Sequence, residues 1–278
     1  MRYFIFLFSF AFYSLSAQLN FEKSLDEAFK KAKTQNKIVF IKYYAEGCST
    51  CKKLTELFNS DKALSDFYNE NFINYAFDSE NKEDEGHLLF NIANLTFEAT
   101  PKLVFFSANR QYLHHSGTQT TAEVTKKMGE DALNPEARTS FLPTKYAQGN
   151  PTLRTIYQYA EYAKVKSDAT VLRKLLEELY IGMQNNNQLS HDGCYHMLLY
   201  LSNETSDPFF QYWIKNIEDL RTYEKDMKYQ AAQLKMQSMV MNELTKLDRK
   251  NLPLEEKNKY KDYIIKSGLN ENPDVFFQ

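Results

Sequence analysis

The first half of the sequence alternates between helical spacing and short apolar runs. A capping box begins at Ser24 and opens a pattern in which Leu25 and Phe29 share one face, which predicts a helix. The run 38–41 is apolar without alternation and predicts a strand buried on both faces. Further strands are predicted at 72–77, 103–106 and 111–115, and further helices at about 48–58, 61–69, 87–95 and 121–133. This order predicts an α/β domain, in which parallel strands joined by helices are followed by a hairpin, so the central sheet is mixed.

From residue 152 onward the sequence shows only helical patterns. Leu172 and Leu179 belong to one clear apolar stripe. Helices are predicted at 153–163, 171–183, 196–201, 209–220, 223–247 and 254–265. Residues 135–151 hold three prolines and one glycine without periodicity and are predicted to be a linker. We therefore expect an α/β domain at 18–134 and an all-α domain at 152–278, built as a small bundle or an array of helix hairpins.

The first seventeen residues are typical of a secretory signal peptide. Arg2 supplies a positive charge, residues 3–15 are apolar, and small residues up to Ala17 precede an expected cleavage site before Gln18. The alternative is a membrane anchor, but the run is short for a span of about 20 apolar residues. No cysteine stands at the cleavage site, so a lipoprotein is not expected. The pattern predicts a periplasmic or secreted protein.

Composition excludes two classes of protein. The 34 basic and 36 acidic side chains nearly balance, so neither domain has the basic excess that nucleic-acid binding requires. Only three cysteines occur, Cys48, Cys51 and Cys194, which is too few for a small scaffold held together by disulfides. The pair at 48 and 51 is therefore expected to serve chemistry or to form a local clip.

Cys48 and Cys51 are separated by two residues and lie between a predicted strand and a predicted helix. This is the placement that a dithiol redox centre needs, and a static disulfide or half of a zinc site are the alternatives. Zinc needs more ligands, and no second pair of this spacing or close histidine pair accompanies it, so no metal is expected. His191, Cys194 and His196 are close in sequence, but a buried free cysteine is the ordinary interpretation of Cys194.

Residues 45–52, Ala-Glu-Gly-Cys-Ser-Thr-Cys-Lys, resemble the Ala-Glu-Trp-Cys-x-x-Cys-Lys block of thioredoxins. Thr100 and Pro101 precede an apolar strand, as do the threonine and cis-proline that face the cysteines in that family. The hairpin and last helix follow in the expected order, so the resemblance covers roughly 20–134. It implies a thioredoxin fold, a cis bond before Pro101, and a client peptide bound beside Thr100 and Pro101.

The resemblance also implies roles for the two thiols. Cys48 would begin the helix, where the helix dipole lowers the pKa of its thiol, and would act as nucleophile. Cys51, one turn on and more buried, would attack Cys48 and resolve the mixed disulfide.

Three departures from the family pattern concern the same site. Gly47 replaces a tryptophan, Ser49-Thr50 replaces the usual dipeptide, and Lys42 stands where thioredoxins carry a buried aspartate. Lys42 and Glu46 are therefore candidate modulating residues. Lys42 could stabilise a thiolate by its charge, act as a base for Cys51, or extend from a strand end toward solvent and pair with Glu46.

These observations predict an exported thiol–disulfide oxidoreductase that acts on protein thiols and disulfides without a cofactor. A membrane electron donor or acceptor would complete the cycle, and the helical domain would hold a partner, a substrate or a second copy of the chain. The alternative is a non-catalytic protein that binds clients or partners through its helical domain and the edge of its thioredoxin-like domain. The sequence does not fix whether the pair reduces, oxidises or isomerises disulfides.

Overall fold

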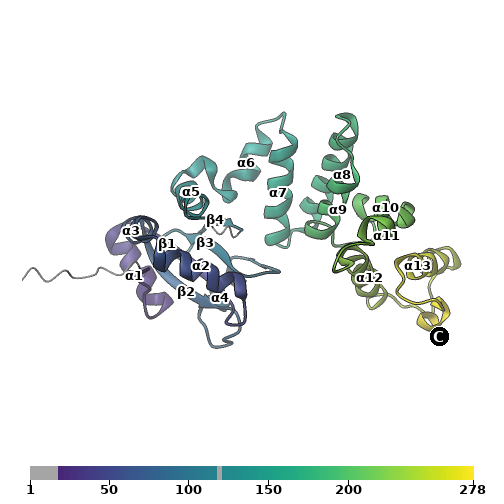
Figure 1. The fold of residues 1–278 in the computed structure, drawn as a ribbon, viewed down its shortest axis with the longest axis horizontal. Coiled ribbons are helices and arrows are strands. Elements are labelled where there is room, and N and C mark those ends of the chain that lie inside the picture. The colour runs from purple at the N-terminus through teal and green to yellow at the C-terminus, as the bar shows by residue number, and fades with distance from the viewer. Residues whose placement is uncertain (1–17, 118–120) are drawn as a thin grey trace, which may run out of the picture. The chain divides into compact units, whose positions relative to one another are not determined.

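The computed structural model describes residues 18–117 and 121–278, and the chain forms two compact units that divide between Phe141 and Leu142 (Figure 1). The predicted signal peptide lies outside the described residues. Two short 3-10 helices, Pro135–Ala137 and Thr139–Phe141, close the first unit, and α6, Leu142–Ala147, begins the second. The segment 135–151, predicted as a linker, therefore contains ordered short helices.

The first unit is built on a four-stranded mixed sheet in the order β2-β1-β3-β4. Strand β1 pairs parallel with β2, and β3 pairs antiparallel with both β1 and β4. The strands span Phe72–Asp78 (β2), Ile38–Tyr44 (β1), Lys102–Phe106 (β3) and Tyr112–Ser116 (β4). In β1 the structure extends the strand beyond the predicted apolar run, so Lys42 lies within the sheet, opposite Ala76 of β2 and Leu103 of β3.

Helices cover both faces of this sheet. Phe40 of β1 contacts Phe58 and Tyr68, which places α2 and α3 on one face. On the other face, Phe106 of β3 contacts Phe29 of α1 and Phe90 of α4. The helices of this unit are α1 Leu25–Gln35, α2 Ser49–Ser60, α3 Lys62–Asn71, α4 Gly86–Ile92 and α5 Ala122–Leu133. The predicted α/β arrangement is confirmed.

The second unit consists of helices in the part of the chain that is described. After α6 come α7 Leu153–Val165, α8 Ala169–Asn185, α9 His191–Tyr200, α10 Pro208–Lys215, α11 Ile217–Glu224, α12 Ala231–Leu244, α13 Leu254–Ser267 and the 3-10 helix Pro273–Phe277. Their apolar faces meet in one core that contains Trp213, Phe209 and Phe210. The predicted all-α region is confirmed.

Two predicted helices of this unit are broken. The stretch 209–220 is divided at Asn216, which ends α10 and precedes α11. The stretch 223–247 begins with the end of α11 and resumes as a helix only at Ala231. The second break is stabilised by Glu224 at the end of α11. Its buried carboxylate accepts hydrogen bonds from the backbone N–H groups of Ala232 and Gln233 and so caps the start of α12.

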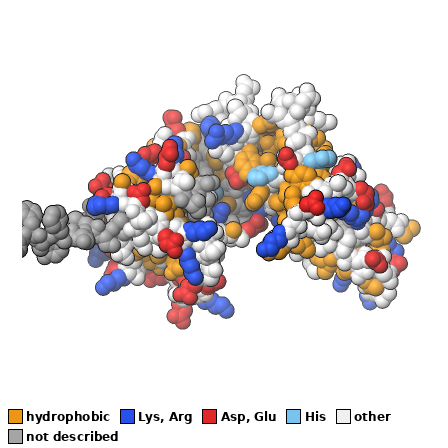
Figure 2. All heavy atoms as spheres, viewed as in Figure 1, with side chains coloured by type: hydrophobic (Ala, Val, Ile, Leu, Met, Phe, Trp, Pro, Cys, Tyr) orange, Lys and Arg blue, Asp and Glu red, His pale blue; other side chains and the backbone are white. Residues whose placement is uncertain are grey.

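Among the helices of residues 18–117 and 121–278, none has the length and apolar character needed to cross a membrane. On the face drawn in Figure 2, lysine and arginine side chains are interspersed with aspartate and glutamate.

Candidate active site

Cys48 and Cys51 form a disulfide at the N-terminus of α2, with their Cα atoms 5.2 Å apart. Strand β1 delivers the chain to this point, and a turn closed by the Cys48 N–H and the Ala45 carbonyl (3.2 Å) connects strand to helix. Cys48 is the N-cap residue of α2, with extended backbone angles. The cysteine pair singled out in the sequence therefore forms a disulfide at the point where β1 leads into α2.

The two sulfur atoms have different surroundings. Cys48 is half-buried, whereas Cys51 is only 3 % exposed. The backbone N–H of Cys51 donates to Cys48 Sγ at 3.0 Å, and the first turn of α2 holds no acidic residue. When the disulfide is reduced, this N–H and the positive end of the helix dipole would favour a thiolate on Cys48. The arrangement makes Cys48 the accessible sulfur and Cys51 the shielded one.

Thr100 and Pro101 lie beside the disulfide. The peptide bond between them is cis, as the resemblance implies. The carbonyl oxygen of Thr100 lies 3.6 Å from Cys48 Sγ, and Pro101 is buried immediately before β3. The structure thus brings together the two segments that the sequence predicted to form the site, although they are some fifty residues apart.

An aromatic cluster supports the segment that leads to Thr100. The ring of Phe97 lies 5.7 Å from that of Tyr43 in β1, 5.7 Å from that of Phe90 in α4 and 5.3 Å from that of His115 in β4, between centroids. These contacts tie the segment to three elements of the core. Sequence inspection missed this cluster, because Phe97 stands in a stretch without periodicity.

His114 and His115 are neighbours on β4. Burial lowers the pKa of His114 to about 4 and that of His115 to about 3, from 6.5. His114 Nδ1 accepts a hydrogen bond from the backbone N–H of Thr139 (3.1 Å), and His115 Nδ1 lies 2.5 Å from the Tyr112 hydroxyl. His114 is buried and His115 half-buried, and the lowered pKa values keep both rings neutral at neutral pH.

Lys42 is buried beneath α2, and its side chain is 7 % exposed. Its Nζ donates to the Thr55 hydroxyl at 2.5 Å, and burial lowers the pKa of its amine. Glu46 is exposed, and no ion pair joins it to Lys42 in the described part of the chain. Glu46 instead acts on Tyr44, whose pKa is raised mainly by burial and further by Asp78 and by Glu46.

Gly47 replaces the tryptophan of the family pattern and is exposed. A Cβ atom added at this position would meet no atom within 4 Å. The space beside Cys48 is therefore open on this side.

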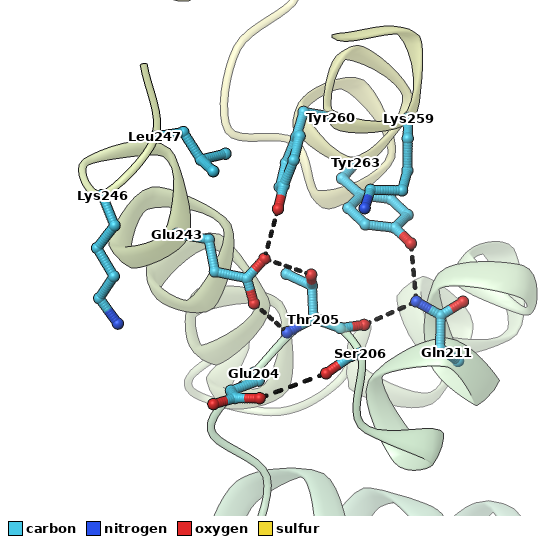
Figure 3. Close-up of a pocket in the computed structure, with 10 residues that line it drawn as sticks. All are labelled: Glu204, Thr205, Ser206, Gln211, Glu243, Lys246, Leu247, Lys259, Tyr260 and Tyr263. Atoms are coloured by element: carbon cyan, nitrogen blue, oxygen red, sulfur yellow. Dashed lines mark hydrogen bonds between the residues drawn. The ribbon is translucent and has the colours of Figure 1, made fainter. Parts of the chain in front are cut away.

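The second unit carries a pocket of about 470 Å³ (Figure 3). One carboxylate organises its wall, since Glu243 accepts from the Thr205 N–H (2.6 Å), the Thr205 hydroxyl (2.6 Å) and the Tyr260 hydroxyl (2.9 Å). Gln211 Nε2 donates to the Thr205 carbonyl (2.7 Å) and the Tyr263 hydroxyl (2.8 Å). These bonds connect α10, α12 and α13 to the loop after α9, so the polar side chains of this pocket hold the fold together.

The histidines and cysteine near residue 194 do not form a metal site in the structure. Within 18–117 and 121–278, no three His, Cys, Asp or Glu side chains are grouped so as to hold a metal ion. Cys194 is fully buried, and burial raises the pKa of its thiol to about 12. His191 Nδ1 instead lies 2.8 Å from the Tyr212 hydroxyl, and His196 Nε2 lies 3.1 Å from the Tyr157 hydroxyl.

Comparison with known proteins identifies the first unit. Residues 20–108 match a protein-family model described as thioredoxin-like. This chain therefore contains a thioredoxin-like domain, followed by an additional helical region.

Several solved structures are similar to part of the chain, including the following two. The solution structure of a putative disulphide-isomerase from Bacteroides thetaiotaomicron is 25% identical, with 43% of this chain and 96% of that chain covered and a TM-score of 0.37. A structure described as DsbH oxidoreductase is 22% identical, with 42% of this chain and 86% of that chain covered and a TM-score of 0.35. No curated protein matches the chain.

Proposed function

We propose that this protein is a thiol–disulfide oxidoreductase that exchanges disulfides with client proteins through Cys48 and Cys51. The observation that carries the proposal is the asymmetric pair at the N-terminus of α2, with a half-buried Cys48 beside the Thr100 carbonyl and a buried Cys51 behind it. A static clip needs no such asymmetry, whereas exchange needs one sulfur that clients can reach and one that they cannot. The thioredoxin-like match of residues 20–108 supports the same conclusion.

The proposed reaction moves two electrons from the dithiol pair to a client. The Cys48 thiolate attacks one sulfur of a client disulfide, so a bond from Cys48 Sγ to that sulfur forms as the client S–S bond breaks. The other client sulfur leaves as a thiolate and takes a proton from solvent. Cys51 then loses its proton and attacks Cys48 Sγ, which restores the Cys48–Cys51 disulfide and releases the second client sulfur. The reverse order transfers a disulfide to the client.

Thr100 and Pro101 are proposed to position the client. The carbonyl of Thr100 is 3.6 Å from Cys48 Sγ, so a client chain that reaches this sulfur passes the Thr100 backbone. The open space at Gly47 leaves room for the client beside Cys48. Glu46, exposed at the same turn, would contribute negative charge where the client approaches.

We further propose that the protein works in the periplasm or after secretion. The apolar N-terminal pattern supports export, and in such a compartment the pair would exchange electrons with a membrane donor or acceptor. The helical region would hold a partner or a second copy of the chain. Cell fractionation and N-terminal sequencing of the mature protein test the export proposal, and a mature chain that retains residues 1–17 in the cytosol would contradict it.

Reduction of insulin by dithiothreitol tests the proposed activity. We expect the wild-type protein to accelerate insulin precipitation and Cys48→Ser to abolish the acceleration, because the attacking sulfur is lost. Cys51→Ser should trap a mixed disulfide with insulin, visible on a non-reducing gel. Cys194→Ser is the matched control, since it removes a buried thiol of the second unit and should leave the rate unchanged.

Wild-type activity no greater than that of Cys48→Ser would overturn the oxidoreductase proposal and leave client binding as the function. If activity is found, the redox potential of the pair decides its direction. A value near about −270 mV favours a reductase and one near about −120 mV an oxidant.

A further inference from the structure

Lys42 is a buried titratable side chain that the exchange reaction described above does not use. It lies in the centre of the sheet, where its neighbours in register are the apolar residues Ala76 and Leu103. Because alternate residues of a strand point to the same face, Lys42 shares the face of Phe40, whose ring packs on Phe58 of α2. Its amine is therefore directed at the helix that carries the dithiol.

The contact with α2 lies on the Cys51 side of the helix. Lys42 Nζ donates to Thr55 Oγ1 (2.5 Å), and that hydroxyl donates to the backbone carbonyl of Cys51 (3.0 Å). Cys51 and Thr55 are four residues apart, so their side chains lie one above the other on one face of the helix, with Cβ atoms about 5–6 Å apart. Side chains on a helix tilt toward its N-terminus, which brings the Thr55 hydroxyl toward Cys51.

No carboxylate compensates Lys42 in the described part of the chain. Besides Thr55, its Nζ lies near the rings of Tyr44 (5.2 Å to the centroid) and Phe21 (5.9 Å). Burial lowers the pKa of the Lys42 amine.

The acidic groups of the neighbourhood act on the tyrosine instead. The pKa of Tyr44 is raised by burial first and then by Asp78 at the end of β2, Glu46 in the turn and Asp84 in the following loop. None of these three carboxylates forms an ion pair with Lys42. From β3 the facing residue is Leu103, which has no charge. An anion that forms close to the charged Lys42 side chain would therefore be stabilised by it.

We propose that Lys42 is the charge partner of Cys51, its ammonium group stabilising the thiolate that Cys51 forms when it resolves the mixed disulfide. This inference rests on the proposed exchange function. In the resolving step Cys51 gives its proton to solvent, the Cys51 thiolate attacks Cys48 Sγ, and the client sulfur leaves as a thiolate that is protonated by solvent. Lys42 touches neither the client nor Cys48, so it acts as a positioning residue for the thiolate.

The pairing also favours the dithiol over the disulfide. In the disulfide form Lys42 faces no anion, whereas in the dithiol form its charge can stabilise a Cys51 thiolate. Removing the amine should therefore make the pair harder to reduce. We expect the equilibrium constant for reduction by dithiothreitol at pH 7 to fall about tenfold in Lys42→Met, which is about 30 mV.

The direct test is a thiol titration of Cys51 in the full chain with Cys48→Ser and Cys194→Ser, where Cys51 is the only remaining cysteine. Absorbance at 240 nm follows thiolate formation as the pH rises. Adding Lys42→Met should lower the acid ionisation constant of Cys51 about tenfold. Lys42→Gln, which can still donate to Thr55 but carries no charge, should give the same change and serves if the methionine variant does not fold. Lys53→Met, an exposed lysine of the same helix, should leave the constant within twofold.

Two outcomes separate this inference from the proposed function. An ionisation constant of Cys51 that stays within twofold in both Lys42 variants overturns the role of Lys42, even if the wild-type protein reduces insulin. A wild-type protein that fails to reduce insulin overturns the exchange function, whatever the titration shows.

Discussion

Acid should weaken the first unit through His114. Its side chain is 6 % exposed, and burial lowers its pKa from 6.5 to about 4. The folded state therefore keeps His114 neutral, while the unfolded chain binds a proton as the pH falls through about 6.5. Stability is lost as the pH falls below that point, and the loss levels off below about 4. His115 acts in the same direction, since its pKa is lowered to about 3.

The size of the effect follows from these two pKa values. The interval from 6.5 to about 4 corresponds to a limit of about 3.4 kcal/mol, at about 1.4 kcal/mol per pH unit. More than half of this loss occurs between pH 7 and pH 5, so His114 alone should lower the free energy of unfolding by about 2 kcal/mol over that interval. His114→Asn keeps an acceptor for the Thr139 N–H but does not titrate in this range, so it should lose about 2 kcal/mol less than the wild-type protein over the same interval.

Hydrogen exchange measures this difference within the full chain. Peptides that cover β3 and β4 report the free energy of opening of the first unit at pH 5 and pH 7, after correction for the intrinsic pH dependence of exchange. Fluorescence of Trp213, the single tryptophan, follows the second unit separately. If wild-type protein and His114→Asn lose the same free energy between the two pH values, the buried neutral histidine is not the source of acid sensitivity.

Two further predictions concern packing and hydrogen bonding in each unit. Gly86→Ala should destabilise the first unit by about 1–3 kcal/mol, because the added Cβ would lie 2.4 Å from the Phe77 ring. Gly47→Ala is the control, because its added Cβ would meet no atom within 4 Å. When both variants are unfolded in urea, Gly47→Ala should change stability by less than about 0.5 kcal/mol. Equal effects of the two alanines would contradict the packing argument. Glu243→Gln should destabilise the second unit by about 1–3 kcal/mol, because the three donors on its carboxylate lose a charged acceptor. Lys246→Gln, on the same pocket, should leave the Trp213 melting curve unchanged, and a similar shift in both variants would show that the carboxylate is not what holds the wall.

The sequence allowed most of the first unit to be predicted because its strands are short apolar runs and its cysteine pair has a diagnostic spacing. Cys48 and Cys51 could be placed between strand and helix from residue pattern alone. Thr100 and Pro101 could be placed beside them only through the family resemblance, because no local pattern relates positions some fifty residues apart.

The environment of Lys42 could not be predicted in the same way. The apolar run ends at residue 41, so the pattern predicts a strand that stops before Lys42, yet β1 continues to Tyr44. Whether a lysine at this point reaches solvent or turns under a helix depends on what covers that face of the sheet. The position of the Thr55 hydroxyl, which accepts a hydrogen bond from Lys42, is fixed by the packing of α2.

In the helical half, periodicity found the helices but not the breaks between them. Helices α11 and α12 are separated without proline or glycine, and the carboxylate of Glu224 in α11 accepts from the N–H groups of Ala232 and Gln233 in the first turn of α12. These residues are only eight and nine positions apart, but the cap depends on the burial of the Glu224 side chain in the fold. Helical spacing does not show which acidic side chain of this stretch is buried.

The unequal burial of the two sulfurs has a consequence for oxidative damage. A peroxide molecule can approach the half-buried Cys48, whereas Cys51 is shielded. A sulfenic acid formed on Cys48 would meet the Cys51 thiol beside it and condense to the disulfide with release of water, before a second peroxide could carry it to the irreversible sulfinic acid. The same arrangement that would resolve a client complex thus converts an oxidative lesion into an ordinary state of the pair.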